Sequence, residues 1–284
     1  MRKCFLLALV CLMTTHVIGQ YQYSWTPRTQ KIYESITSLR IPEARTLISQ
    51  DKKANASNLI YPLLESYADF YQLFLNENKA EYSRMYPAFE QRIQILEDGP
   101  KQSPYHLHSL ALAHLHKSLI AIRFNKNLEA ALDFRKAFLL FKANKKAFPN
   151  FTPTDVYYGL MSTVIGTIPK GYQWMASLLG MSGKITEGNA LVLKYINSKD
   201  AYSNQCRNEA LFVYPYLVMN FEGNKKKTFD FIEKTNYDLV NNHLHAYMTT
   251  NLYLNNQQSQ KALQIASSIN PSNQYLTLPF WQLE

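Results

Sequence analysis

Residues 157–191 read YYGLMSTVIGTIPKGYQWMASLLGMSGKITEGNAL and contain six of the nine glycines of the chain. Two short apolar segments flank Pro169, which cannot donate a backbone hydrogen bond and disfavours helix at the residue before it. The sequence therefore predicts one helix ending near Thr167 and a second beginning near Tyr172. The second should end at Gly180 in a left-handed conformation.

The remaining glycines of this stretch predict close packing. Gly159 belongs to the first apolar segment, Gly183 to a tight turn, and Gly188 to a further helix that another backbone must approach closely. The stretch is interpreted as a packed helical hairpin at the centre of the protein. The alternative is a hairpin that dips into a membrane surface, since neither segment reaches the ~20 residues of a spanning helix. Valine should destabilise the fold more at Gly180 than at Gly223, which is assigned to a polar surface turn.

Apolar residues elsewhere recur with the period of an amphipathic helix, and short polar turns separate successive helices. In the second helix of one such pair, over residues 128–146, Ala130, Phe134 and Ala137 match the small–aromatic–small spacing of a tetratricopeptide repeat. The first helix of that pair lacks the tryptophan and glycine of the repeat, so the match is degenerate. The predicted fold is all-α, an α-solenoid of antiparallel helical pairs with degenerate tetratricopeptide-like repeats.

A family resemblance rests on the central stretch. Its pattern comprises Gly159-Leu160, Ile168-Pro169, Leu178-Leu179-Gly180, Gly183, Gly188 and Leu191. This pattern resembles the core signature of a tetratricopeptide-repeat family that includes the eukaryotic inclusion body clearance proteins and many exported bacterial proteins of unassigned role. In its details the sequence of this stretch is more similar to the bacterial members of the family. The resemblance implies a helical-repeat fold and supplies no catalytic residue.

The N-terminus has the features of a secretory signal peptide. A basic start at Arg2-Lys3 precedes an apolar run, and residue 19 offers a cleavage position. The domain prediction is a signal peptide over residues 1–19 and a single helical-repeat domain over 20–284. Cys206 is then the sole remaining cysteine, which excludes an internal disulfide and suits a packing role. We expect an exported protein of the periplasm or cell envelope if the source is bacterial, without a lipid anchor.

The sequence offers no strong candidate for catalysis, a metal or a cofactor. Three HxH pairs begin at His106, His114 and His243, but on a helix such side chains point in different directions. No HExxH, CxxC, GxSxG or phosphate-binding glycine loop is present. The formal charge of +9 falls to +7 when Arg2 and Lys3 are removed, and the excess is dispersed. Export makes nucleic-acid binding an unattractive explanation of this charge.

Two places are candidates for contact with a partner. Lys170, Tyr172 and Trp174 could form an exposed aromatic–basic rim, although the simpler interpretation places Trp174 in the core and Lys170 in solvent. At the C-terminus, Phe280 and Trp281 begin an apolar face with no later helix to cover it, and a solenoid needs a polar cap. This end is therefore predicted to be truncated or to bind a partner, with self-association in isolation.

These observations predict a non-enzymatic scaffold that binds a protein or peptide partner in the cell envelope. The first alternative is a membrane-surface or lipid-associated protein that uses the 157–191 hairpin. The second is an enzyme whose site is assembled from distant residues.

Overall fold

Prolines and capping side chains begin many of the helices. Thr26 caps the first helix by accepting from the backbone of Thr29, and Pro27 follows in the first turn. Ser103 does the same before Pro104. The helices are α1 (Pro27–Thr37), α2 (Ile41–Ala54), α3 (Ile60–Asn76), α4 (Lys79–Met85), α5 (Pro87–Glu97), α6 (Pro104–Arg123), α7 (Asn127–Ala147), α8 (Pro153–Gly166), η1 (Lys170–Tyr172), α9 (Gln173–Leu178), α10 (Ile185–Ile196), α11 (Arg207–Leu217), the π-helix η2 (Val218–Glu222), α12 (Lys225–Lys234), α13 (His243–Leu254) and α14 (Ser259–Ser268).

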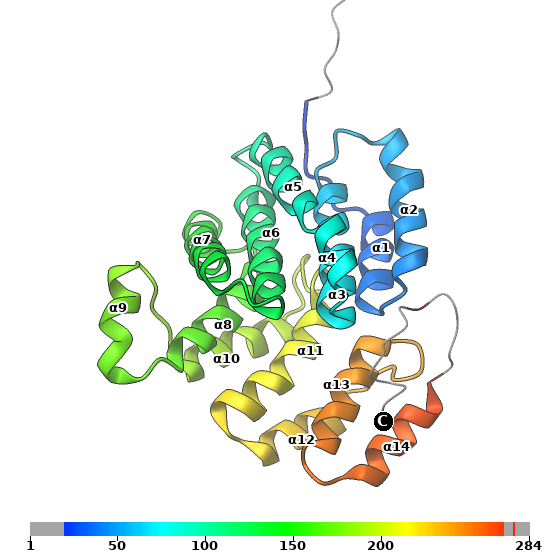
Figure 1. Ribbon diagram of the computed structural model, residues 1–284, viewed down its shortest axis with the longest axis vertical. Coiled ribbons are helices and arrows are strands. Elements are labelled where there is room, and N and C mark those ends of the chain that lie inside the picture. Colours follow the sequence, from blue (N-terminus) through cyan, green and yellow to red (C-terminus); the bar gives the residue numbers. More distant parts are fainter. Residues whose placement is uncertain (1–19, 270–274, 276–284) are drawn as a thin grey trace, which may run out of the picture.

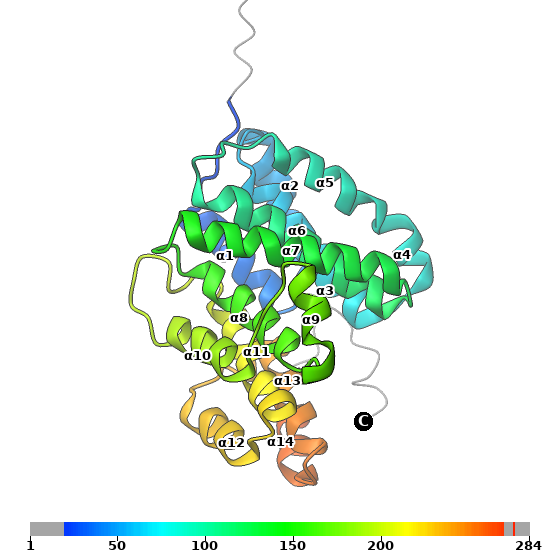
Figure 2. The ribbon, with the colours of Figure 1, turned by 90° about the vertical axis from the view of Figure 1, so that its left-hand side faces the viewer.

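The computed structural model describes residues 20–269 and Tyr275, and within them every regular element is helical. The prediction of an all-α fold is therefore confirmed. Figure 1 shows α1 to α7 in the upper part of the molecule and α11 to α14 in the lower part, with α8 and α10 between them. Helix α9 protrudes to the side in Figure 1, and the view turned by 90° shows it on the face nearest the viewer (Figure 2).

Two helical pairs contribute most to the packing of the central region. Helix α6 packs along α7, and α8 packs along α10. In the first pair Ala130 and Ala137 are buried, Phe134 is half-buried against the core, and Ser118 of α6 donates to the Ala130 carbonyl at 2.8 Å. Small residues at these positions thus lie where the two helices approach each other. The second pair is not continuous in sequence, because η1 and α9 are inserted between its helices.

Helix α11, in the later part of the chain, packs back against the first helix. It packs against α1, α8, α10 and α13. Asn208 on α11 donates to Thr37 Oγ1 of α1 at 2.9 Å, across a sequence separation of 171 residues. In a simple solenoid each repeat contacts its neighbours alone. The contact between α11 and α1 therefore adds a closure that the predicted solenoid did not include.

Prolines and a capping asparagine set several of the later helix boundaries. The segment after Asn78 divides at Pro87 into α4 and α5, and Asn242 caps α13, which begins at His243. Helix α11 contains Pro215 and ends at Leu217, after which the chain passes into the π-helix. The Leu211 carbonyl, which loses its helical donor at Pro215, accepts instead from the Tyr237 hydroxyl at 2.9 Å.

The predicted central hairpin is wrong in one respect. Its second helix, α9, is not buried against the first, and within η1 and α9 the single buried residue is Ala176. The partner of α8 is α10, which follows later in the chain. No helix among residues 20–269 combines the length and the apolar character that a membrane span requires.

Candidate partner-binding site

The excursion between α8 and α10, residues 167–182, is called the arm. Glycines pack its base tightly. A β-carbon at Gly183 would overlap the Ser162 carbonyl, and one at Gly188 would overlap Thr163 and the Gly159 carbonyl. A β-carbon at Gly166 would lie 2.7 Å from the backbone nitrogen of Ile185, closer than real contacts allow. Because these glycines lack side chains, the backbones at the two ends of the arm pack directly against each other.

The far corner of the arm is attached to α7. Arg135 Nε donates to the Leu179 carbonyl at 2.9 Å, and Lys142 Nζ donates to the Gly180 carbonyl at 3.3 Å. Gly180 has a φ of +78°, as expected for a left-handed residue after a helix. A β-carbon there would lie 3.2 Å from Leu139. These attachments engage the backbone of the arm and leave its large side chains free.

Helix α9 has the reverse of the usual amphipathic orientation. Its inner side faces a hollow of about 700 Å³ beneath the arm, which is lined by Gln173, Ala176 and Ser177 together with residues of α8 and α10. Its large apolar side chains point away from that hollow: Trp174 is 61% exposed and Leu178 77% exposed. A surface helix of a globular protein normally turns its apolar stripe inward.

Exposed apolar side chains also lie on α7. Leu128 and Leu132 are exposed and share with Arg135 the face of α7 that supports the arm, because positions four and seven residues apart lie on one side of a helix. We call the combined set the arm surface. It consists of Leu128, Leu132, Tyr172, Trp174, Met175, Leu178 and Leu179.

The charges beside the arm surface are mostly basic. Lys170 is exposed at the start of η1, and Lys142 lies at the Gly180 corner. Of the nearby acidic residues, Glu187 is paired with Lys184 at 2.6 Å and Glu129 is exposed on α7. The arm surface is therefore an apolar ridge with a basic border.

The predicted contact residues have different outcomes. The structure places Lys170, Tyr172 and Trp174 together on the exposed arm, so the expectation that Trp174 belongs to the core is wrong. Pro169 precedes η1 and is exposed, as the predicted break in the helix requires. Phe280 and Trp281 lie outside the described residues. Sequence reasoning did not include Leu128 and Leu132, although two leucines four residues apart among charged neighbours were a visible signal.

Histidine pairs do not form a metal site in the described part of the chain. Residues 20–269 and 275 contain no group of three or more His, Cys, Asp or Glu side chains that could hold a metal ion. The members of the pairs have separate partners: His114 bonds Asp133 at 2.6 Å, whereas His116 bonds Ser66 at 3.0 Å.

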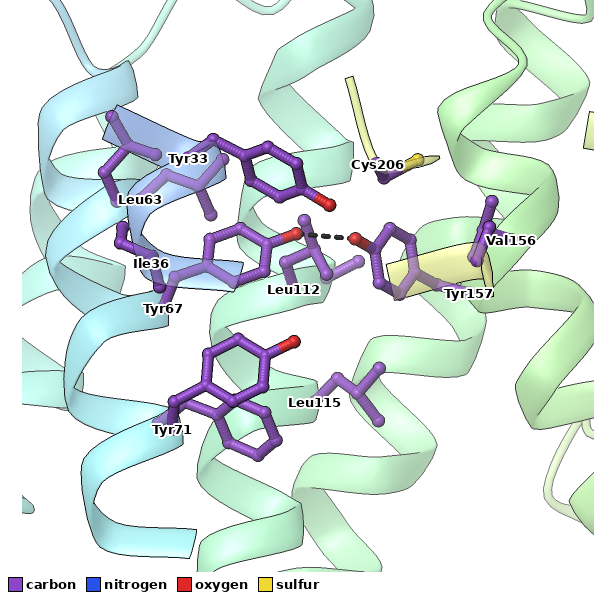
Figure 3. Packing of buried hydrophobic residues seen from close by; sticks show 14 of the residues in the cluster. Tyr33, Ile36, Leu63, Tyr67, Tyr71, Leu112, Leu115, Val156, Tyr157 and Cys206 are labelled. Atoms are coloured by element: carbon purple, nitrogen blue, oxygen red, sulfur yellow. Dashed lines mark hydrogen bonds between the residues drawn. The ribbon is translucent and has the colours of Figure 1, made fainter. Parts of the chain in front are cut away.

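A buried carboxylate that the sequence analysis missed lies at the centre of the fold. Glu209 of α11 accepts hydrogen bonds from Tyr33 at 3.2 Å, from Tyr71 at 3.3 Å and from Tyr157. The Tyr67 hydroxyl is 2.6 Å from that of Tyr157. Figure 3 shows the four tyrosine hydroxyls pointing toward one another from α1, α3 and α8. We call Glu209 and these tyrosines the tyrosine–glutamate junction.

The junction combines burial with the absence of a cation. Glu209 forms no ion pair with any described residue, and its burial raises the pKa of its carboxyl group to about 7, against the opposing effect of the hydroxyl donors. Burial likewise raises the pKa of the Cys206 thiol nearby, as expected for an unreactive packing cysteine. The junction therefore ties α1, α3, α8 and α11 together within the buried core.

Comparisons of the chain with models of known protein families, with curated proteins and with solved structures found no match.

Proposed function

We propose that this chain is an exported, non-enzymatic scaffold that binds a protein or peptide partner through the arm surface. Export rests on the signal-like sequence of residues 1–19, and the relation to degenerate tetratricopeptide-like repeats rests on the helical pairs and the triplet Ala130, Phe134 and Ala137. The cell envelope is the proposed location.

One observation supports this function above the others: α9 turns its apolar side outward, although the two ends of the arm that carries α9 are packed tightly together. An apolar helix face without a cover loses the free energy that burial would supply, about 25 cal/mol for each Å². The chain nevertheless holds Trp174 and Leu178 in solvent on a supported arm. A face of this kind is explained by a partner that covers it.

The composition of the arm surface favours a protein partner. Tryptophan, tyrosine, methionine and arginine are enriched in protein interfaces, where a few large side chains contribute most of the affinity. Trp174 and Leu178 are four residues apart on one helix face, which is the spacing of anchors that enter a groove. The partner is therefore expected to present an apolar groove with acidic groups at its border.

Cross-linking from the arm tests this function. A photoreactive residue at position 175 should capture a partner in native envelope, and the purified partner should then bind the isolated chain. Trp174→Ser with Leu178→Ser should abolish both. Leu263→Ser is the matched control, because Leu263 is 65% exposed on α14, away from the arm. Equal binding by both variants would refute the assignment to the arm surface.

A second candidate function, association with a membrane surface, is favoured by the pairing of Tyr172 and Trp174 with Lys170. Aromatic rings with a polar tip collect at the headgroup level, and lysine is attracted to anionic lipids. Vesicle flotation separates the two functions. Recovery of the chain with anionic vesicles, lost in the Trp174→Ser and Leu178→Ser variant, would favour the membrane over a protein partner.

A further inference from the structure

A second hollow, on a different surface from the arm, lies between α2, α3 and the α4–α5 segment. Its volume is about 830 Å³, within the usual range of small-ligand sites. We call it the arginine hollow. It is lined by Ile41, Pro42, Arg45, Asp69, Gln72, Asn76, Glu81, Arg84, Met85, Ala88, Arg92 and Tyr275.

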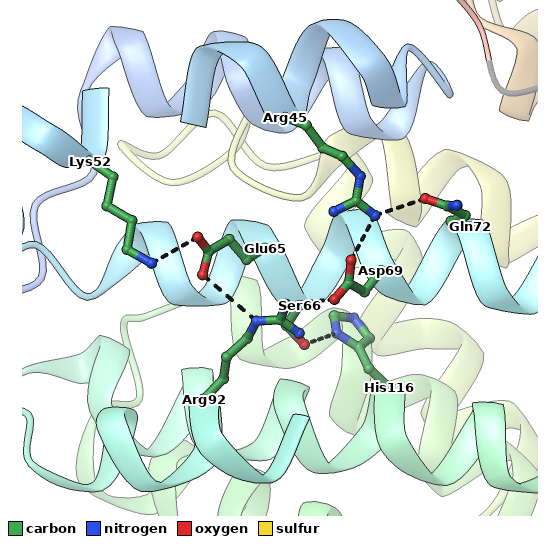
Figure 4. Close-up of polar contacts among 8 residues, drawn as sticks. All are labelled: Arg45, Lys52, Glu65, Ser66, Asp69, Gln72, Arg92 and His116. Carbon is green, nitrogen blue, oxygen red and sulfur yellow. Dashed lines mark hydrogen bonds and ion pairs between the residues drawn. The ribbon is translucent and has the colours of Figure 1, made fainter. Parts of the chain in front are cut away.

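Asp69 fixes two of the three guanidinium groups. It accepts from Arg45 Nη2 at 2.6 Å and from Arg92 Nη2 at 2.5 Å, so that one carboxylate lies between two cations (Figure 4). Arg45 Nη2 also bonds Gln72 at 2.8 Å. Both of these hydrogen bonds use Nη2, and the Nε and Nη1 groups of Arg45 have no hydrogen-bond partner among the described residues. The Arg45 side chain is 38% exposed, so a ligand can reach these groups. The guanidinium is thus oriented but still able to donate.

Arg84 supplies a second available donor. It is exposed on α4 and forms no ion pair with any described residue, although it lines the same hollow as Arg45. Arg92 is not assigned to a ligand, because its side chain is 12% exposed and it already contacts Asp69 and Glu65. Arg92 Nη1 is unpaired within the described part of the chain but buried, so Arg45 and Arg84 supply the accessible donors of the hollow, and planar guanidinium groups suit a carboxylate.

The charge balance distinguishes a carboxylate from a phosphate. Three guanidinium groups line the hollow against the carboxylates of Asp69 and Glu81, which leaves one positive charge in excess. Glu81 is held by Gln72 at 2.7 Å and by Asn76 at 3.4 Å, with no cation within ion-pair distance among the described residues. A carboxylate carries one negative charge, which the single excess positive charge balances, whereas a phosphate monoester carries about 1.5 to 2 at neutral pH and would be repelled more strongly by Glu81.

The remaining wall is apolar and comes from Ile41, Pro42, Met85 and Ala88. We propose that the arginine hollow binds a monocarboxylate with an apolar body, whose carboxylate contacts Arg45 and Arg84 and whose body lies against Ile41 and Met85. An aliphatic acid and the C-terminus of an apolar peptide share this chemistry. The proposal is independent of the partner assigned to the arm surface.

Calorimetry with matched acids and amides tests the proposal on the full chain. The ligands are octanoate, octanamide, N-acetyl-Leu-Leu with a free carboxyl group, and the same dipeptide as its amide. Octyl phosphate is the phosphate comparison. An acid should bind and its amide should not. Binding of octanoate alone identifies a small aliphatic acid, and binding of the dipeptide acid alone identifies a peptide C-terminus. Equal binding of acids and amides, no binding of either acid, or tighter binding of octyl phosphate would overturn the proposal.

Variants keep the test independent of folding. Arg84→Ala should weaken acid binding by about tenfold or more, since it removes a charged hydrogen-bond donor. Arg84 is exposed, so this substitution should leave the fold unchanged. Glu81→Gln should strengthen binding several-fold, which a purely structural role would not produce. Lys146→Ala, which removes an exposed charge from α7, is the control and should leave affinity unchanged. An Arg84→Ala protein that binds as tightly as the parent would contradict the assignment.

Discussion

The tyrosine–glutamate junction and the arm place polar and apolar side chains in opposite environments. The junction buries an acid among hydroxyl groups at the meeting point of four helices, whereas the arm exposes tryptophan and leucine on a segment with one buried side chain. In each place the usual distribution of polar and apolar groups is reversed. The difference between them is access: the reversed region that solvent reaches is suited to binding, and the inaccessible one is suited to holding helices in position.

The largest effect is expected where the base of the arm is packed. Gly183→Ala should lower the free energy of unfolding by about 3 kcal/mol, because its β-carbon would overlap the Ser162 carbonyl and backbone cannot move aside easily. Gly171→Ala is the matched control, since no atom lies within 4 Å of a β-carbon there. Urea denaturation of both variants measures the difference. Similar midpoints would show that the base of the arm is not tightly packed.

The junction should make stability depend on pH. Its folded pKa of about 7 lies above the unfolded value of 4.5, so the folded state binds the Glu209 proton more tightly. The contribution of this group is fully present below pH 4.5 and is lost as pH rises through about 7. The total change is about 3 kcal/mol.

Replacement of Glu209 isolates this effect. The stability of Glu209→Gln relative to the parent should rise between pH 4.5 and 8, because the amide stays neutral while the carboxyl group of the parent ionises. Glu34→Gln, on the exposed side of α1, should show no such trend. Denaturant titrations at several pH values provide the measurement. Parallel curves for Glu209→Gln and the parent would contradict the described environment of the carboxylate.

A smaller effect separates two glycines at helix ends. Both Gly180 and Gly223 have positive φ, at +78° and +70°, so valine should cost about 1–2 kcal/mol at either position. Valine at Gly180 also meets Leu139, whereas no atom lies within 4 Å of a β-carbon at Gly223. Gly180→Val should therefore be the more destabilising by about 1 kcal/mol or less. Thermal melts that rank the two in the opposite order would contradict this.

The smallest effect on stability is expected on the arm surface. Trp174→Ser with Leu178→Ser should change the free energy of unfolding by no more than about 0.5 kcal/mol for each substitution, because neither side chain is buried. Binding should nevertheless be lost. A large fall in melting temperature would mean that these side chains are covered in the folded protein, and the contrast between the arm and the junction would disappear.

The sequence by itself determined the helical class and the position of many helix ends. Periodic apolar residues require one face of each helix to be covered, and residues such as Pro27, Ser103 and Gly180 act on the backbone within a few positions of themselves. These effects are local, so a reader of the sequence can predict them. The close approach of another backbone to Gly188 was also predicted, because a glycine within an apolar helix indicates a near neighbour, but only the structure identified Gly159 as that neighbour.

The tertiary structure alone decided which faces remained uncovered and which distant side chains met. Trp174 has the same local pattern whether α9 packs on α8 or protrudes from it, and the choice depends on α10 pairing with α8. Glu209 meets Tyr33 across a separation of 176 residues, and Arg84 shares a hollow with Arg45 from a different helix. No local pattern encodes such meetings, because they follow from the packing of whole helices rather than from the preferences of single residues.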